Sequence, residues 1–472
     1  MNCESRKRIA ATAPVFAAML AMSTGCAPTV AQPVVQDSQS VRTATTTVPD
    51  KPNELAAAAP ASELSPAQSQ IESTTLIGLD EVLQRARTDS YAVLEAAAQW
   101  RASQARVDRA RGAMLPQLTL RAGASHLNGA QVGSFGDLQD NVEFSRYQPS
   151  LEFTLRANPG EALARMRASK LDSTAGDHAH ANAQRVAMLE AALAHQALVL
   201  SAAEERIAED LAADAARFVS IAQARADSGV ASGAEAARAE VDAARALADL
   251  PQAKASRENA GVRLATLLRL PISNTLRPRE TEVASLQRSA DAASGEPTRR
   301  PDVETARARA LAAGETLRAA WWSVVGPQLE LGVGERLIGV ELDELKDTTQ
   351  AWGLLTFTFS FEALAQLKEA RFVEQQANLR ARRSEDEARA EISIARAQLI
   401  ASRAAIPARQ RAADAAQTAH LAQTDRFTAG TGSGFEVVET QALKATTDRE
   451  LVRAILFYNV AQLRLAAALG DW

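Results

Sequence analysis

Two glutamates near the end of the chain are the pair of side chains whose spacing best suits a chemical role. Glu436 and Glu439 follow a glycine-bearing segment and lie three residues apart, which places both carboxylates on one face of a helix. Around an axis shared by three copies of the chain, they would form two stacked anionic rings that favour cations. As an alternative, they are solvated acids of a first helical turn, where negative charge complements the helix dipole.

The other candidate groups lack the spacing that their chemistry requires. His178 and His180 lie two residues apart and so do not share a helix face, which argues against a metal site. Gly430, Gly432 and Gly434 alternate with other residues, but no strand precedes them and no Lys-Ser/Thr follows, as a phosphate-binding loop requires. No Ser/His/Asp arrangement stands out. We therefore predict that the chain is not an enzyme and uses no cofactor and no metal ion.

The chain contains one long segment twice. Residues 161–269 and 362–470 both begin Glu-Ala-Leu-Ala, continue in an Ala-rich pattern and contain one glycine-bearing break, and equivalent positions differ by 201 without a gap. The leg from Glu161 to Gly229 would be a helix roughly 100 Å long at 1.5 Å per residue. A seven-residue apolar repeat in the first copy favours a coiled coil, and an ordinary antiparallel helix pair is the alternative. We predict two helical hairpins, at 161–270 with a tip near 229–233, and at 362–470 with a tip near 430–434.

Alternating side chains predict four β-strands between the helices. Helices beginning near Leu79 and Pro301 each end before a Pro-Gln-Leu sequence, after which apolar and polar residues alternate. A second alternating stretch precedes each long hairpin, and in the second repeat it extends to Phe361. We therefore predict strand pairs within 116–156 and 327–361, joined by polar loops at about 127–147 and 336–350.

The N-terminal residues have the pattern of a secretory signal. A basic cluster precedes an apolar run at 9–22 that is too short to span a membrane, and the run ends in Ser23-Thr24-Gly25-Cys26, which resembles a bacterial lipoprotein cleavage site. Ordinary signal cleavage a few residues later is the alternative. The predicted organisation is a signal peptide at 1–25, a lipid-anchored flexible tether at 26–74, a first repeat at 75–270, a linker at 271–300 and a second repeat at 301–472.

Composition and strand pattern together favour an oligomer in a membrane. Hydrophobic residues make up 46% of the chain but aromatic residues only 4%, so the core must come from long, closely packed helices. The net charge of −5 with interspersed signs argues against a nucleic-acid partner. Strands of about 10 residues with one apolar and one polar face suit a transmembrane barrel, but four cannot close one, so at least three copies are needed for a wet pore. A soluble sheet covered on one face is the alternative.

These features are similar to those of the TolC family of outer-membrane efflux proteins. The resemblance rests on the paired Pro-Gln-Leu sequences, the Arg300-Pro301-Asp302-Val303 opening, the Gly-x-x-Ser tips and the closing segment 458–470. It implies a mainly α fold with a small transmembrane β part, in which a homotrimer closes a twelve-stranded β-barrel above a periplasmic α-barrel. It further implies a passive exit duct in the outer membrane that reaches through the periplasm to an adaptor protein and an inner-membrane pump. The lipoprotein-like start resembles the drug-efflux branch.

The resemblance also assigns candidate site residues. In the family, a Gly-Thr-Arg-Thr tip is followed by two acids that ring the closed periplasmic aperture, and Glu436 and Glu439 match these acids. Gly432 stands in place of the arginine, and in the first copy Arg238 matches Glu439. Cys26 is the implied lipidation site. The implied adaptor-contacting tip residues are Gly229, Ser232, Gly430 and Ser433.

Three functions follow from these expectations. The first is an exit duct for small molecules in a tripartite efflux pump. The second is the outer-membrane channel of a type I protein secretion system. The third is a lipid-anchored periplasmic coiled-coil scaffold with a small soluble sheet. Substrate identity is not expected to be encoded in the duct.

Overall fold

The structure is a computed structural model, and it describes residues 75–132, 135–230, 232–272, 276–280, 300–341 and 344–470. The predicted signal peptide at 1–25, the tether at 26–74 and Cys26 therefore lie outside the described residues, as does most of the predicted linker.

Seven helices and eight strands make up the described residues. The helices are α1 (Leu79–Asp89), α2 (Tyr91–Gly112), α3 (Pro159–Asp227), α4 (Gly233–Leu267), α5 (Pro301–Val325), α6 (Phe361–Thr428) and α7 (Gly434–Leu469). The strands are β1 (Thr75–Ile77), β2 (Gln117–Arg121), β3 (Ala124–Val132), β4 (Leu138–Tyr147), β5 (Ser150–Ala157), β6 (Leu276–Pro278), β7 (Gln328–Ile338) and β8 (Lys346–Thr356).

The two longest helices begin at side-chain caps directly after the sheet. Helix α3 has 69 residues, and the Asn158 side chain accepts a hydrogen bond from the Glu161 amide at 3.2 Å. Helix α6 has 68 residues, and the Ser360 hydroxyl accepts from the Ala363 amide at 3.1 Å. Such caps satisfy amides that a first helical turn leaves without partners, so they fix where each helix starts.

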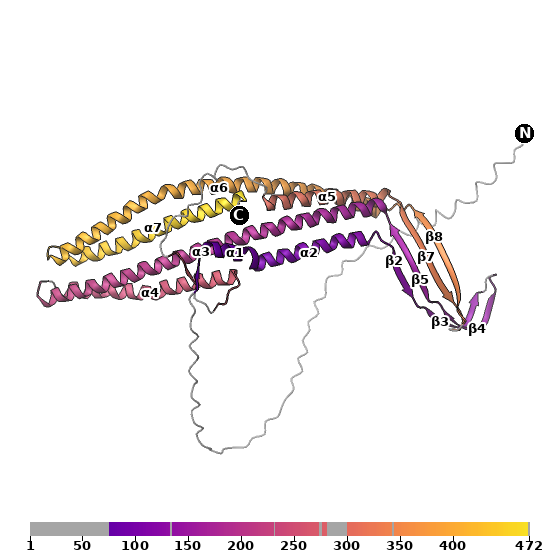
Figure 1. Cartoon of the computed structure of the whole chain (residues 1–472), viewed down its shortest axis with the longest axis horizontal. Helices are drawn as coiled ribbons and strands as arrows, with labels where there is room; N and C mark the ends of the chain where they lie inside the picture. Colours follow the sequence, from indigo (N-terminus) through magenta and orange to yellow (C-terminus); the bar gives the residue numbers. More distant parts are fainter. Residues whose placement is uncertain are drawn as a thin grey trace, which may run out of the picture. The chain divides into compact units, whose positions relative to one another are not determined.

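The helices are ordered in the same way as the strands. Strands β2, β5, β7 and β8 form one antiparallel sheet in that order (Figure 1). Helices α2, α3, α5 and α6 pack side by side in the corresponding order, and further from the sheet the order is α4, α3, α7, α6. Each repeat therefore contributes one half of both the sheet and the helical layer, as the duplication predicts.

The core is a series of small apolar clusters along the helices. The largest combines α1, α3 and α4 beneath the parallel pair β1–β6, with Leu198, Leu264 and Val82 fully buried. Helices α3 and α7 are long and apolar enough to cross a membrane by length and composition, yet 61% of the apolar window of α3 is buried inside the chain. A span needs only about 20 residues. The apolar character of α3 is therefore explained by its position between α2, α4, α5 and α7.

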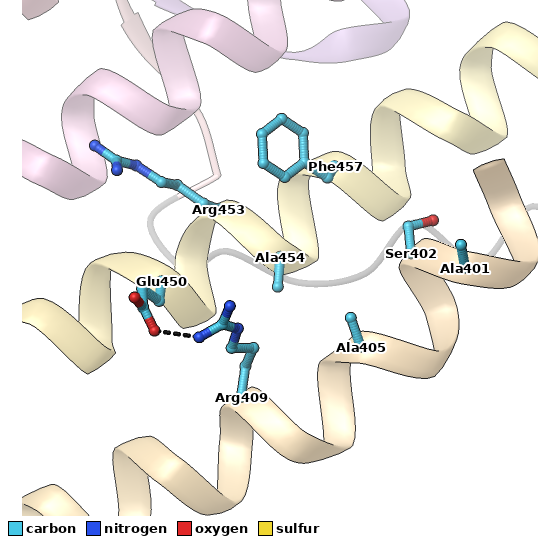
Figure 2. A pocket seen from close by; sticks show the side chains of 8 residues that line it. All are labelled: Ala401, Ser402, Ala405, Arg409, Glu450, Arg453, Ala454 and Phe457. Carbon is cyan, nitrogen blue, oxygen red and sulfur yellow. Dashed lines mark hydrogen bonds and ion pairs between the residues drawn. The ribbon is translucent and has the colours of Figure 1, made fainter.

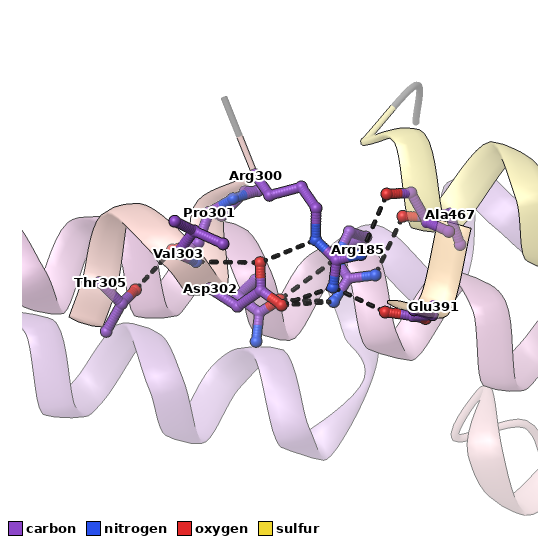
Figure 3. A network of polar contacts seen from close by, with 10 residues as sticks. Arg185, Arg300, Pro301, Asp302, Val303, Thr305, Glu391 and Ala467 are labelled. Atoms are coloured by element: carbon purple, nitrogen blue, oxygen red, sulfur yellow. Dashed lines mark hydrogen bonds and ion pairs between the residues drawn. The ribbon is translucent and has the colours of Figure 1, made fainter. Parts of the chain in front are cut away.

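Two buried arginines hold the C-terminal end of α7 (Figure 3). Arg185 Nη1 donates to the carbonyl oxygen of Ala467, and Arg300 Nη1 donates to that of Ala468, each at 3.0 Å. The last carbonyl groups of a helix have no partners within the helix and bear partial negative charge. The arginines of α3 and of the segment before α5 thus fix the end of the second repeat against the first.

Two carboxylates balance these arginines. Asp302 lies 2.6 Å from Arg300 and 3.6 Å from Arg185, and Glu391 of α6 lies 2.7 Å from Arg300. Burial raises the pKa of Asp302, but the hydrogen bond and charge of Arg300 and the charge of Arg185 outweigh burial, so the pKa stays below its ordinary value. The Arg-Pro-Asp opening of the second repeat is therefore an ion-pair junction between four helices.

Four sequence expectations about element boundaries are wrong. The predicted polar loop at 127–147 is largely the hairpin β3–β4, because a strand with polar residues on both faces shows no alternation. The predicted loop at 336–350 is likewise shorter, since β7 and β8 extend into it. The predicted first helix breaks at Ser90, which has extended backbone angles, and β8 ends at Thr356 rather than near Phe361, which begins α6.

Candidate functional site

The four-stranded sheet has one apolar and one polar face. Cross-strand partners point to the same side, so the pairing Leu118–Phe153–Val333 defines one face and Thr119–Glu152 the other. The apolar residues of the first face include Leu118, Leu120, Leu151, Phe153, Leu155, Leu329, Leu331, Val333, Ala351, Gly353 and Leu355. Of these, Leu118 is 60% exposed and Leu120 is 77% exposed. Glu335, Thr349 and Asp347 lie on the same side, at the end of the sheet away from the helices. No described helix covers this face, so its apolar side chains need a non-aqueous neighbour.

The polar face contains a row of ion pairs. Glu152 of β5 lies 3.6 Å from Arg121 of β2 and 3.6 Å from Arg336 of β7. Four residues along β5 towards the helices, Arg156 pairs with Glu330 at 2.9 Å. Beside these ion pairs, the large apolar side chains on the polar face are Trp352 and Leu354 of β8, and the Trp352 ring covers Gly332. Ile338 also belongs to this face but lies at the end of β7 away from the helices.

Both edges of the sheet are open. Strands β2 and β8 are the outer strands, and neither pairs with another described strand on its free side. The unpaired backbone groups of an edge strand cost free energy wherever water is absent. The backbone groups on these two edges therefore have no strand partner within the described residues.

The two hairpin tips have the same backbone turn. Gly229 donates to the carbonyl of Ala226 and Gly430 to that of Phe427, each at 3.0 Å, and both pairs are related by the offset of 201. Gly229 and Gly430 have φ values of 73° and 82°, a left-handed conformation that favours glycine at a helix C-terminus. The two copies of the repeat therefore have the same turn conformation at their tips.

The predicted tip residues all lie at these turns. Gly229, Ser232, Gly430 and Ser433 are exposed, and each serine hydroxyl caps the helix that follows it. Glu436 lies in the first turn of α7 and is half-buried, whereas Glu439 is exposed; neither makes an ion pair with another described residue.

Gly432 has no room for the side chain that the family places there. A Cβ atom at Gly432 would lie 2.8 Å from the Phe427 amide nitrogen and 3.0 Å from the carbonyl carbon of Arg426. Arg225 of the first tip instead contacts the second: its Nη1 donates to the Phe427 carbonyl and its guanidinium lies 4.1 Å from the centre of the Phe427 ring. Arg225 thus lies at a different position from the tip arginine of the resembled family, which corresponds to Gly432 in this chain.

The tips also share an apolar cluster that sequence reasoning missed. Phe427 packs against Phe218 with ring centres 5.1 Å apart, and Val437 closes the cluster. Arg238, the counterpart of Glu439, lies 4.7 Å above the Phe435 ring. The sequence does contain a signal for this cluster: Phe427, three positions before Gly430, is an aromatic residue in an otherwise Ala-rich helix.

A groove between α6 and α7 has a volume of about 330 Å³ (Figure 2). Its walls include Ala405, Ala454 and Phe457. The charged groups of its walls are paired, since Arg409 bonds to Glu450 and Arg453 to Glu204. Among the described residues the groove therefore presents no unpaired charge for a substrate, and the sheet and the tips remain the candidate sites.

The sequence of the first repeat matches a known family. Residues 82–268 match the family model described as outer membrane efflux protein. A curated relative, the pyoverdine export outer membrane protein OpmQ of Pseudomonas putida, is 29% identical over 276 residues. That match covers 54% of this chain and 55% of OpmQ, so the chain spans about half the length of this relative.

Solved structures match over most of the chain. The outer membrane protein VceC of Vibrio cholerae superposes with a TM-score of 0.74 at 20% identity, over 83% of this chain and 96% of VceC. The CmeC outer membrane channel of Campylobacter jejuni gives a TM-score of 0.74 at 16% identity, over 89% of this chain and 94% of CmeC. These likenesses confirm the predicted fold class, namely long helical hairpins with a small sheet. The first repeat is thus similar in sequence to the outer membrane efflux proteins, and the duplicated hairpins with the two-faced sheet have the fold of the solved outer-membrane channels.

Proposed function

We propose that the chain is one subunit of a trimeric outer-membrane channel through which solutes leave the cell passively. The observation that carries this proposal is the sheet, with its exposed apolar face, its charged face and its two open edges. Hydrocarbon would cover the apolar face, and water in a lumen would cover the charged face. Strands β7 and β8 have 11 residues each, about the length of a transmembrane strand.

The common order of strands and helices supports closure into a ring. In one copy β8 and α6 lie at one side and β2, α2 and α4 at the other. Pairing β8 of each copy with β2 of the next would satisfy both edges and bring α6 beside α4 of the neighbour. Three copies would give twelve strands, a barrel wide enough for water, whereas two would give eight strands with a lumen filled by side chains.

A test of this proposal measures assembly and conduction separately. Native mass spectrometry of the protein in detergent should give three times the chain mass, and planar bilayers containing it should show discrete conductance steps. A monomer that stays soluble after detergent removal would overturn the proposal and would favour the periplasmic scaffold. Aqueous release after removal of the N-terminal segment would point the same way.

We infer further that the exported cargo is a small molecule and that the tips contact a periplasmic adaptor linked to an inner-membrane pump. The family description and the pyoverdine export named for OpmQ support this inference. A type I secretion channel is the competing function. Site-specific photocrosslinkers at Ser232 and Ser433 should capture an adaptor in cells, and the same probe at Thr316, far from the tips on α5, is the control.

Glu436 and Glu439 are proposed to narrow the duct at its periplasmic end. Their spacing, their position just behind the tip and their lack of ion-pair partners among the described residues support this role. E436Q/E439Q should lower cation selectivity in single-channel recordings. Unchanged selectivity and current would show that the two carboxylates are solvated acids of a first helical turn.

Cys26 is proposed to carry the lipid anchor, because the Ser23-Thr24-Gly25-Cys26 sequence follows an apolar run of signal-peptide length. Mass spectrometry of the purified chain should give an N-terminus at Cys26 with added acyl groups. An unmodified N-terminus beyond Cys26 would indicate ordinary signal cleavage.

A further inference from the structure

Three charged side chains on adjacent strands form a compact group on the polar face of the sheet. Glu152 of β5 lies between Arg121 of β2 and Arg336 of β7, at 3.6 Å from each. The register places both arginines beside Ser150, so they approach Glu152 from the same side along the strands. A Cβ atom at Gly334 would lie 2.9 Å from Glu152 Cγ, so the glycine directly opposite leaves space for this carboxylate.

The group has an uncompensated positive charge. Two guanidinium groups share one carboxylate, and the side chain of Glu152 is only 14% exposed while those of Arg121 and Arg336 are 67% and 43% exposed. The carboxylate therefore lies low against the sheet and the arginines extend above it. The neighbouring pair Arg156–Glu330 is balanced and does not supply a second acid.

Closure of a barrel would not neutralise this charge. The polar face of β8, which would lie beside β2 of the next copy, presents Thr348, Gln350, Trp352 and Leu354, with Lys346 at its end. None of these side chains is acidic. The excess positive charge therefore persists for every pairing register in which a residue of β8 lies beside Arg121 and the polar face stays inward.

We propose that Arg121 and Arg336 form an anion-binding belt in the lumen of the barrel, with Glu152 as the residue that positions both guanidinium groups. This proposal rests on the proposed channel function. The ligands that it fits are carboxylate and phosphate groups of passing solutes, because a guanidinium binds planar or tetrahedral oxyanions through two parallel hydrogen bonds. The belt would thus favour anions at the outer-membrane end of the duct.

The experiment uses tripolyphosphate as the probe and the full-length protein in planar bilayers. The background variant E436Q/E439Q removes the acidic pair at the other end of the duct, so that it does not determine the sign of selectivity. Tripolyphosphate added on the extracellular side should reduce the current. In R121Q/R336Q its half-blocking concentration should rise roughly tenfold, the loss expected for charged hydrogen bonds, and the reversal potential in a KCl gradient should shift towards cations.

Two further variants separate the belt from general effects of charge. E152Q removes the carboxylate and should shift the reversal potential towards anions, opposite to the arginine variant. R380Q/R382Q removes two exposed arginines of α6, about 30 Å along the helix from its sheet end, and should leave tripolyphosphate block unchanged. If E152Q and R121Q/R336Q shift the potential in the same direction, or block is unaffected by R121Q/R336Q, the belt does not exist.

The failure of the belt and the failure of the channel are distinguishable. Discrete conductance with unaltered block and selectivity would overturn the belt alone. Absence of conductance from a correctly assembled trimer would overturn the channel and the belt together. A soluble monomer would do the same.

Discussion

The junction of Arg185, Arg300 and Asp302 gives a stability prediction whose size follows from the geometry. Asp302→Asn keeps the shape of the side chain but removes the charge that both guanidinium groups share. Arg300 is 4% exposed, so it cannot recover hydration without moving, although it keeps its bond to Glu391. Arg185, also buried, would lose its ion pair and keep the carbonyl of the last α7 turn.

The expected loss in the free energy of unfolding is about 2 kcal/mol. Removing one partner of a fully buried pair costs about 3–5 kcal/mol. The side chain of Asp302 is 27% exposed, and water there lowers the cost. Glu304→Gln on the same helical turn is the matched control, because Glu304 pairs with Arg307, which is 52% exposed; its loss should stay below about 1 kcal/mol.

The effect should depend on pH in a defined direction. The pKa of Asp302 in the folded chain lies below its ordinary value of 3.8, so its contribution is complete above that value and is lost as pH falls through the lower, folded value. The difference between Asp302→Asn and the unsubstituted protein should therefore be full at pH 7 and narrow below about pH 4.

Urea titrations of the protein in detergent, followed by circular dichroism at 222 nm at one protein concentration, measure both effects. Equal small losses for Asp302→Asn and Glu304→Gln would refute the reasoning about the buried arginines. A difference that widens in acid would refute the sign of the pKa shift.

Further substitutions test other contacts by the same titration. Glu205→Gln should cost about 3 kcal/mol, because it leaves Arg257 buried without the carboxylate that lies 2.7 Å away; a loss under 1 kcal/mol would contradict the buried pair. Gly160→Ala should cost about 1–3 kcal/mol, because the new Cβ would lie 2.1 Å from the Trp322 ring, whereas Gly112→Ala meets no atom within 4 Å and should be neutral or slightly stabilising. Gly432→Arg should destabilise the second tip despite restoring the family residue, and faster hydrogen exchange limited to the tip amides would show this.

The duplication made the long elements predictable. An offset of 201 locates Gly229 and Gly430 as equivalent, and the structure gives both the same left-handed turn. The strand pairs were also predictable, because a period of two is distinct when one face is apolar. The β3–β4 hairpin was not, because its polar residues on both faces conceal the period, and strand ends depend on pairing partners rather than on local sequence.

The candidate sites were predictable only where they are local. Glu436 and Glu439 are close in sequence, so their common helix face follows from spacing alone. Arg121, Glu152 and Arg336 meet only through the register of three strands. Two of these strands, β2 and β5, belong to the first repeat, and β7 belongs to the second. Arg225 reaches the second tip across two hairpins in the same way. Alternation places Arg121 and Glu152 on a polar strand face but cannot pair them, and Arg336 begins the predicted loop at 336–350.

The two ends of the proposed duct bear opposite fixed charge, and salt provides a direct test of that arrangement. The tip positions Glu235, Arg238, Glu436 and Glu439 sum to two negative charges per copy, whereas the belt around Glu152 has one positive charge. Ions of either sign would thus meet one attractive and one repulsive region in series. The Debye length falls from about 10 Å at 0.1 M salt to about 3 Å at 1 M. Charges on the wall influence passing ions only within about this distance. As salt rises, their influence is therefore lost at the centre of a wide lumen before it is lost at a narrow aperture. At fixed KCl ratio, the reversal potential should therefore shift towards cations as total salt rises, since the belt is screened first; a potential that moves towards anions would place the narrow point of the duct at the belt.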